Sequence, residues 1–232
     1  MRNLALMWVL AGVAVALLAA GDGKPPVSTF TDKRDGKVYK IVKIGRQVWF
    51  AENLNYAAGG SKCYGEGGKV VIDIDENGNA ITTTTLSNVE VQAYCAKYGR
   101  LYNWETALTA CPAGTHLPTD AEWTALVDYV GGKKQAGTKL KSSTGWNSDK
   151  EVPAGTNAYG FSALPGGIGY YSGGEFFDAG KYGGWWSATE LAAYDAWDRS
   201  MYYFDEFVGR GNDIKTGLFS VRCVLYDEKE RK

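Results

Sequence analysis

The sequence has little of what several functional classes require. Lysine and arginine number 25 against 26 aspartates and glutamates. No excess of positive charge therefore exists to neutralise a phosphate backbone, which disfavours a nucleic-acid partner. The single histidine, His116, excludes His-rich metal sites. Proline is scarce, with 6 residues, whereas aromatic residues make up 13% of the chain. This balance excludes a collagen, a coiled coil and a disordered chain, and it indicates one globular domain.

Several chemical motifs are absent as well. No Gly-x-Ser-x-Gly turn is present to expose a hydrolase serine, and no Cys-x-x-Cys pair is present to start a zinc site. Lectin-type sugar binding through calcium would need Gln-Pro-Asp or Glu-Pro-Asn, and neither tripeptide occurs. Residues 73–78 match the first half of a calcium loop, but Thr84 stands where a bidentate glutamate is needed. We interpret them as an Asn-Gly hairpin turn, and we predict no metal and no cofactor.

The N-terminal 21 residues carry an export pattern. A basic start is followed by an uncharged run over residues 4–20, and Ala19-Ala20-Gly21 supplies the small residues that a signal peptidase needs. No cysteine follows them, so lipidation has no acceptor. The length of the run leaves a cleaved signal peptide and an uncleaved N-terminal anchor open, and contact with a membrane is expected only from the anchor. Residues 22–29 are a linker to a domain that we place at the cell surface, in the periplasm or outside the cell.

The four cysteines are expected to form disulfides, because the export pattern places the chain in an oxidising compartment. They are Cys63, Cys95, Cys111 and Cys223. Four cysteines allow three pairings, and the residues alone leave all three open.

Alternating and β-branched residues predict two hairpins. The first spans residues 36–51 and turns at Gly45-Arg46, and the second spans residues 69–86 with a threonine-rich return arm. The four threonines, 82–85, indicate an exposed edge strand. Further strands are expected at 196–204 and 217–226, and a charged tail at 227–232.

Three short helices are predicted, over residues 89–97, over residues 104–110 and from Thr119 onward. Thr119 and Glu122 form a capping box at the start of the third helix. Trp123, Leu126, Val127 and Val130 then give it one apolar stripe, and Gly131-Gly132 ends it. No long helix is expected between 133 and 217, where glycine and aromatic residues dominate.

Six segments, in this order along the chain, resemble the Fibrobacter major paralogous domain family (FISUMP). They are residues 31–55, 98–104 (Tyr-Gly-Arg-Leu-Tyr-Asn-Trp), 111–123 (Cys-Pro-x-Gly-x-His-Leu-Pro-Thr-Asp-x-Glu-Trp), 160–167 (Gly-Phe-Ser-Ala-Leu-Pro-Gly-Gly), 185–190 (Trp-Trp-Ser-x-Thr-Glu) and 219–224 (Phe-Ser-Val-Arg-Cys-Val). The resemblance covers residues 30–226, with the hairpin at 69–86 as a local insertion.

The family is similar in turn to the sulfatase-modifying-factor and formylglycine-generating group, a branch of the C-type-lectin-like fold. The resemblance implies an exported α+β domain with short helices on small antiparallel sheets, long Gly/aromatic-rich loops and two disulfides. It also implies the pairing Cys111–Cys223, which leaves Cys63–Cys95. Formylglycine-type oxidation needs an active pair of thiols in addition to structural bridges, so we do not carry that activity over.

Aromatic residues cluster between positions 170 and 186, and rigid rings can stack on sugar faces. We expect Trp185 and Trp186 to pack in the core and the loop at 170–182 to be partly exposed. The six candidate ligand-binding rings are Tyr170, Tyr171, Phe176, Phe177, Tyr182 and Trp186. The sequence favours an exported, non-catalytic domain that binds a polysaccharide or a cell-surface protein. The alternatives are an enzyme, of the formylglycine-generating kind or another, and a purely structural module of a surface assembly.

Overall fold

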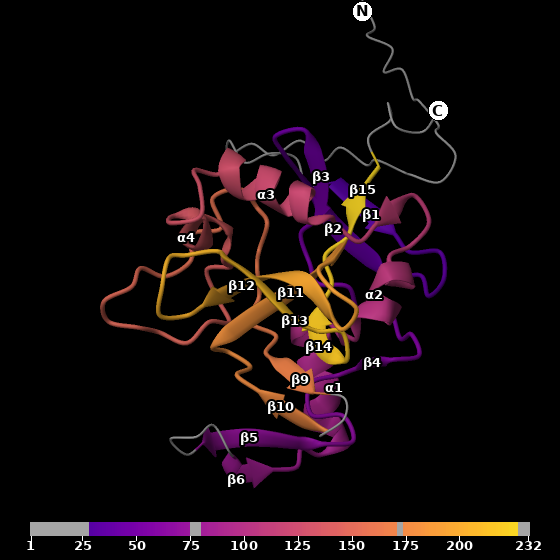
Figure 1. Cartoon of the computed structure of the whole chain (residues 1–232), viewed down its shortest axis with the longest axis vertical. Coiled ribbons are helices and arrows are strands. Elements are labelled where there is room, and N and C mark those ends of the chain that lie inside the picture. The colour runs from indigo at the N-terminus through magenta and orange to yellow at the C-terminus, as the bar shows by residue number, and fades with distance from the viewer. Residues whose placement is uncertain (1–27, 75–79, 171–173, 227–232) are drawn as a thin grey trace, which may run out of the picture.

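The computed structural model describes residues 28–74, 80–170 and 174–226, which form two sheets and four short helices (Figure 1). The first sheet has five strands, all antiparallel. Their order is β1 (Ser28–Thr31), β2 (Val38–Ile44), β3 (Gln47–Phe50), β15 (Val224–Leu225) and β8 (Thr115–His116). The predicted first hairpin is β2–β3. Its turn needs glycine at position 45, where φ is 60° and a β-carbon is disfavoured.

The second sheet has ten strands and is larger than the sequence indicated. Its main path runs β13 (Gly209–Ile214), β12 (Asp195–Tyr202), β11 (Tyr182–Glu190), β14 (Gly217–Ser220), β9 (Ile168–Tyr170), β10 (Glu175–Phe177), β5 (Lys69–Ile74) and β6 (Ala80–Thr84). Two short strands, β4 (Ser61–Lys62) and β7 (Leu101–Tyr102), extend from β14.

This sheet is mixed, which corrects the expectation of small antiparallel sheets. Strand β14 pairs in parallel with β11, and β5 pairs in parallel with β10. The chain leaves the β11–β12–β13 meander and returns to the opposite edge of β11, where β14 runs in the same direction as β11. Alternation of side chains reveals that a segment is a strand but not which strand it joins, so these pairings were not predictable from pattern.

The second predicted hairpin, β5–β6, forms one end of this sheet (Figure 1). Strand β6 is the edge strand, and Thr82–Thr85 are exposed, as the threonine run predicts. Residues 75–79, which contain most of the partial calcium-loop match, lie outside the described residues.

The predicted helices are present as α1 (Asn88–Tyr98), α2 (Trp104–Ala110) and α3 (Asp120–Tyr129), and a further short helix, α4 (Ala136–Leu140), follows. The capping box at the start of α3 is confirmed, with Thr119 and Glu122 bonding reciprocally. Glu122 also lies 2.7 Å from His116 Nε2, so the single histidine joins the edge strand β8 to the cap of α3.

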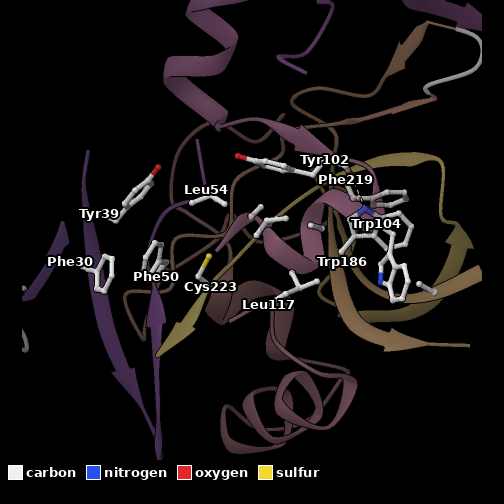
Figure 2. Close-up of a cluster of buried hydrophobic side chains, with 14 of the residues drawn as sticks. Phe30, Tyr39, Phe50, Leu54, Tyr102, Trp104, Leu117, Trp186, Phe219 and Cys223 are labelled. Atoms are coloured by element: carbon white, nitrogen blue, oxygen red, sulfur yellow. Dashed lines mark hydrogen bonds between the residues drawn. The ribbon is translucent and has the colours of Figure 1, made fainter. Parts of the chain in front are cut away.

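Different helices cover the two faces of the ten-stranded sheet. Figure 2 shows one side, where Trp186 and Phe219 from the sheet pack beside Trp104 of α2. The Trp186 and Phe219 ring centroids are 4.5 Å apart. On the other side, Trp185 packs against Trp123 of α3. Both Trp185 and Trp186 are fully buried, as expected.

A polar hub lies between the sheets and is centred on Asn53. Its Oδ1 accepts hydrogen bonds from Trp185 Nε1 at 2.9 Å and from Arg222 Nε at 2.7 Å. Its Nδ2 donates to Tyr98 O at 2.8 Å and to Ser220 Oγ at 3.2 Å.

Arg222 is fully buried, and loss of hydration lowers the pKa of its guanidinium to about 9. The guanidinium donates three further hydrogen bonds, to the backbone carbonyl oxygens of Phe50, Phe161 and Ser162.

Replacing Asn53 with alanine is expected to lower the free energy of unfolding by about 3 kcal/mol, because two buried N–H donors lose their acceptor. Urea denaturation measures the change. Asn212→Ala is the matched control, since that asparagine is exposed on β13, and it is expected to alter stability by less than about 0.5 kcal/mol. Equal effects of the two substitutions would contradict the role of the hub.

Both disulfides form as the resemblance implied. Cys111 bonds Cys223 across 112 positions, and Cys63 bonds Cys95 across 32 positions. The first bond joins the end of α2 to the segment before β15, and the second joins the turn after β4 to α1. All four cysteines of the chain are used, which leaves no free thiol.

Candidate functional site

The candidate site lies on the sheet face that also carries Trp186. On this face Tyr182 of β11 stands opposite Tyr202 of β12, and Trp186 stands opposite Asp198. Because side chains alternate along a strand, these four residues project to one side. Strand β12 therefore brings an aspartate and a tyrosine to the same face at positions that differ by four.

Strands β13 and β9 add two further side chains to this face. Asp198 is paired with Gly211 of β13, so Asp213, two residues further along, projects to the same side. Gly217 of β14 is paired with Tyr170 of β9, and a β-carbon on Gly217 would lie 3.6 Å from Asp213 Oδ1. We call this group the Tyr–Asp patch; it consists of Tyr170, Tyr182, Tyr202, Asp198 and Asp213.

The tyrosines of the patch differ in exposure. Tyr202 is 38% exposed and Tyr182 is 8% exposed, while Tyr170 is half-buried. The rings of Tyr182 and Tyr202 lie 4.8 Å apart, and Tyr170 meets Phe177 edge to face at 5.8 Å. Phe204, which is also exposed, stacks near Tyr202 and extends the aromatic surface. Tyr182 is thus the base of the patch, and Tyr170 and Tyr202 are its accessible rings.

Asp198 is the most unusual group of the patch. The residue is only 4% exposed, and within the described residues no donor hydrogen-bonds to its carboxylate. Burial, reinforced by the nearby charge of Asp213, raises its pKa from 3.8 to about 7. Burial also raises the pKa of Asp213. Asp213 is only partly buried, and its Oδ1 accepts a hydrogen bond from Ile214 N at 2.7 Å. A largely buried carboxylate without a protein donor is unfavourable for folding, so Asp198 marks a place that packing alone does not explain.

Residues on the opposite face of β12 and β13 hold the patch in position. Arg199 points away from the patch and donates to Asp120 Oδ1 of α3 at 2.7 Å. Arg210 donates to the same carboxylate and lies 3.5 Å from the centre of the Trp197 ring. Burial opposes ionisation of Asp120, but the hydrogen bonds from both arginines outweigh it and lower its pKa. These contacts fix the two strands that carry Asp198 and Asp213 onto a rigid helix.

The structure places the six predicted rings in three different situations. Tyr170 and Phe177 are partly exposed, as expected, and their rings pack edge to face. Tyr171 lies outside the described residues. Phe176 is fully buried and Tyr182 nearly so, which corrects the expectation that these two rings are partly exposed. Trp186 is fully buried, as its expected core position implies, although it was also a candidate ligand-binding ring. Phe176 packs in a separate cluster beside Tyr64, because alternation along β10 turns it inward while Phe177 turns outward.

Sequence reasoning missed Asp198, Asp213 and Tyr202. Strand β12 reads Asp-Ala-Trp-Asp-Arg-Ser-Met-Tyr, and Ala196 and Met201 identify neither face as clearly buried. The available signal was an aspartate in the middle of a strand rich in buried residues. Its meaning depended on the pairing with β11 and β13, which the sequence does not give.

Two comparisons with known proteins find nothing significant, among curated proteins and among solved structures. A family model described as the Fibrobacter succinogenes major domain, however, matches residues 42–225, which is well over half of the chain. The chain belongs to this family. The resemblance drawn from the six segments is therefore confirmed.

The family's segments meet at the Asn53 hub. Five of the six contribute to it, through Asn53 itself, Tyr98, Phe161 with Ser162, Trp185, and Ser220 with Arg222. The motifs by which the family is identified are thus the residues that join the two sheets. All five residues of the Tyr–Asp patch lie outside these segments, so membership of the family does not determine what the patch binds.

Proposed function

We propose that this protein is an exported, non-catalytic domain that binds a carbohydrate through the Tyr–Asp patch. The observation that carries the proposal is the Asp198 carboxylate. The residue is more than nine-tenths buried, none of the described residues donates a hydrogen bond to the carboxylate, and the packed rings of Tyr182 and Tyr202 lie on the same face of the sheet. Sugar hydroxyl groups can donate hydrogen bonds to such a carboxylate. Tyr170 and Tyr202 offer flat, rigid surfaces on which a pyranose ring can stack at low entropic cost.

Export is supported by the two disulfides, which persist in oxidising compartments, and by the pattern in residues 1–21. Within the residues that the structure describes, no helix is long and apolar enough to cross a membrane. We further propose that the arrangement of short helices and sheets is of the C-type-lectin-like kind, with the long bridge Cys111–Cys223 closing the domain. The fold would then present its ligand-binding residues on sheet strands and the loops between them.

The non-catalytic part of the proposal is supported by the use of all four cysteines in disulfides, since formylglycine-type oxidation needs reactive thiols. Titration of the folded, unreduced protein with a thiol reagent is expected to detect none. Two reactive thiols per chain would instead favour the oxidase alternative.

A second candidate function, glycoside hydrolysis, is favoured by the raised pKa values of Asp198 and Asp213. A general acid must hold its proton near neutral pH, and Asp198 meets that condition. Its partner, however, should be readily ionised, whereas burial raises the pKa of Asp213 as well. Release of reducing ends from an oligosaccharide that the protein binds, abolished by Asp198→Asn, would establish hydrolysis over simple binding.

The carbohydrate proposal is tested with a glycan array, followed by titration calorimetry on the sugars retained. Tyr202→Ala is expected to weaken binding about tenfold, because it removes the most accessible ring of the patch. Tyr129→Ala is the matched control; that tyrosine is 59% exposed on α3, on the other side of the sheet. Blank arrays, or equal losses in both variants, would contradict the proposal and favour the purely structural module.

A further inference from the structure

The charges around the tyrosines of the patch are mostly of one sign. Asp213 acts on Tyr170, and both Asp198 and Asp213 act on Tyr182. Asp178, Asp198 and Asp205 act on Tyr202. In each case the negative charge adds to burial in raising the pKa of the phenol.

The basic groups near the patch are already engaged elsewhere. Arg199 is bound to Asp120 on the opposite face of the sheet. Lys181 is exposed and lies 3.9 Å from Asp178. The Nζ of Lys141 donates to the backbone carbonyl oxygens of Tyr202 and Asp205. None of these cations makes a hydrogen bond or an ion pair to the carboxylate of Asp198 or Asp213 within the described chain. The charge of Arg199 favours ionisation of Asp198 from the opposite face, but it is outweighed by burial and by the charge of Asp213.

This arrangement distinguishes a cationic ligand from a neutral one. A neutral hydroxyl can donate to one carboxylate, but it leaves the repulsion between Asp198 and Asp213 unchanged. An ammonium group can donate to both and neutralises their field. Tyrosine faces also attract cations through the ring quadrupole, and three tyrosines border the carboxylates. A cation therefore satisfies both the aromatic and the acidic half of the patch.

Building on the carbohydrate-binding function above, we propose that the Tyr–Asp patch selects a sugar that carries a protonated amine, of the kind found in unacetylated glucosamine. The ammonium group lies between Asp198 and Asp213, and the sugar ring stacks on Tyr202. Gly211 suits that placement, because it is paired with Asp198 and has no side chain beside the carboxylate; a β-carbon there would lie 3.2 Å from Asp198 Oδ2.

Three tetrasaccharides test the proposal, because they are β-1,4-linked glucans that differ in the group at carbon 2. These are the glucosamine tetramer, the N-acetylglucosamine tetramer and cellotetraose, and binding is measured by calorimetry on the full domain at pH 6. The glucosamine tetramer is expected to bind at least tenfold more tightly than the other two. Its advantage is expected to shrink as salt rises, because the recognition is ionic.

Three single substitutions distinguish recognition of the amine at the patch from a general attraction of the cationic sugar to the acidic surface of the protein. Asp198→Asn and Asp213→Asn are each expected to remove most of the preference for the amine. Glu151→Gln changes net charge equally at an exposed position and is expected to leave it intact. Calorimetry in two buffers of different ionisation enthalpy adds a second readout. At pH 6 the ammonium is expected to displace a proton from Asp198 in the wild-type protein, and no such release is expected in Asp198→Asn.

The outcomes distinguish this inference from the function on which it rests. Equal binding of all three tetramers, weakened by Tyr202→Ala, would overturn the selection of an amine and leave carbohydrate binding standing. If the glucosamine tetramer binds equally well to the wild-type protein and to both aspartate variants, its binding reflects general attraction to an acidic surface. That result would also overturn the selection of an amine by the patch. Binding of none of the three, together with a blank glycan array, would contradict both proposals.

Discussion

Replacing both Cys111 and Cys223 with alanine is expected to lower the free energy of unfolding by about 5 kcal/mol. The bond closes a loop across 112 positions, so its loss gives the unfolded chain much more conformational freedom. Domains of this size are typically stable by about 5–15 kcal/mol, and the change is therefore a large part of the total. Chemical denaturation, followed by tryptophan fluorescence, measures it.

The second disulfide provides the matched comparison. Removing Cys63 and Cys95 opens a loop of only 32 positions, and the chain-entropy relation gives about 4 kcal/mol. The long bridge is thus expected to matter more than the short one. The reverse order would show that native contacts, such as the hydrogen bond from Arg100 to Cys63 Sγ at 3.2 Å, outweigh loop length.

Replacing Asp198 with asparagine is expected to stabilise the protein near neutral pH and to flatten its pH profile. Asp198 has a pKa of about 7 when folded, against 3.8 for an ordinary aspartate. Between these values the folded state keeps a proton that the unfolded chain releases, so stability falls as pH rises. The loss amounts to about 4 kcal/mol over the window from pH 4 to pH 7, at about 1.4 kcal/mol per unit of pKa shift. Asparagine carries no charge and escapes this loss.

Unfolding free energies of both proteins at half-unit steps from pH 4 to pH 8 provide the measurement. The informative quantity is the difference between the two curves, because Asp120, with its lowered pKa, contributes stability that is lost as pH falls. The difference is expected to widen with pH up to about pH 7 and then level off. Parallel curves would mean that Asp198 is readily ionised in the folded protein. The exposed control Glu151→Gln is expected to give a curve parallel to that of the wild-type protein; a control curve that diverges as much as that of Asp198→Asn would contradict the special role of Asp198.

Local features of the fold were predictable because their causes lie within a few residues. The capping box of Thr119 and Glu122 needs one turn of helix, and the β2–β3 turn needs only glycine at position 45. The disulfide pairing was predictable in another way, from family resemblance, because the residues alone allow three pairings. The hydrophobic stripe of α3 likewise predicted which of its residues are buried.

The candidate site was only partly predictable because it depends on strand pairing over long separations. Tyr170 and Asp213 meet through β14, which enters the sheet between β9 and β11. The aromatic run at 170–186 predicted the partial exposure of Tyr170 and Phe177, but composition could not show that alternate rings turn into the core. Asp198 gained its significance from burial, which no local pattern around it reveals.

The position of the long disulfide bears on how the domain would respond to mechanical tension. All five residues of the patch lie between positions 111 and 223, inside the ring of chain that this bond closes. A pull on the two ends of the chain would enter through β1 and β15, which share the five-stranded sheet, and would then pass from Cys223 to Cys111 through sulfur. The strands that carry the patch would bear none of the load along their backbone. In a domain stretched between two anchoring points, the disulfide would thus protect the strands of the Tyr–Asp patch from extension.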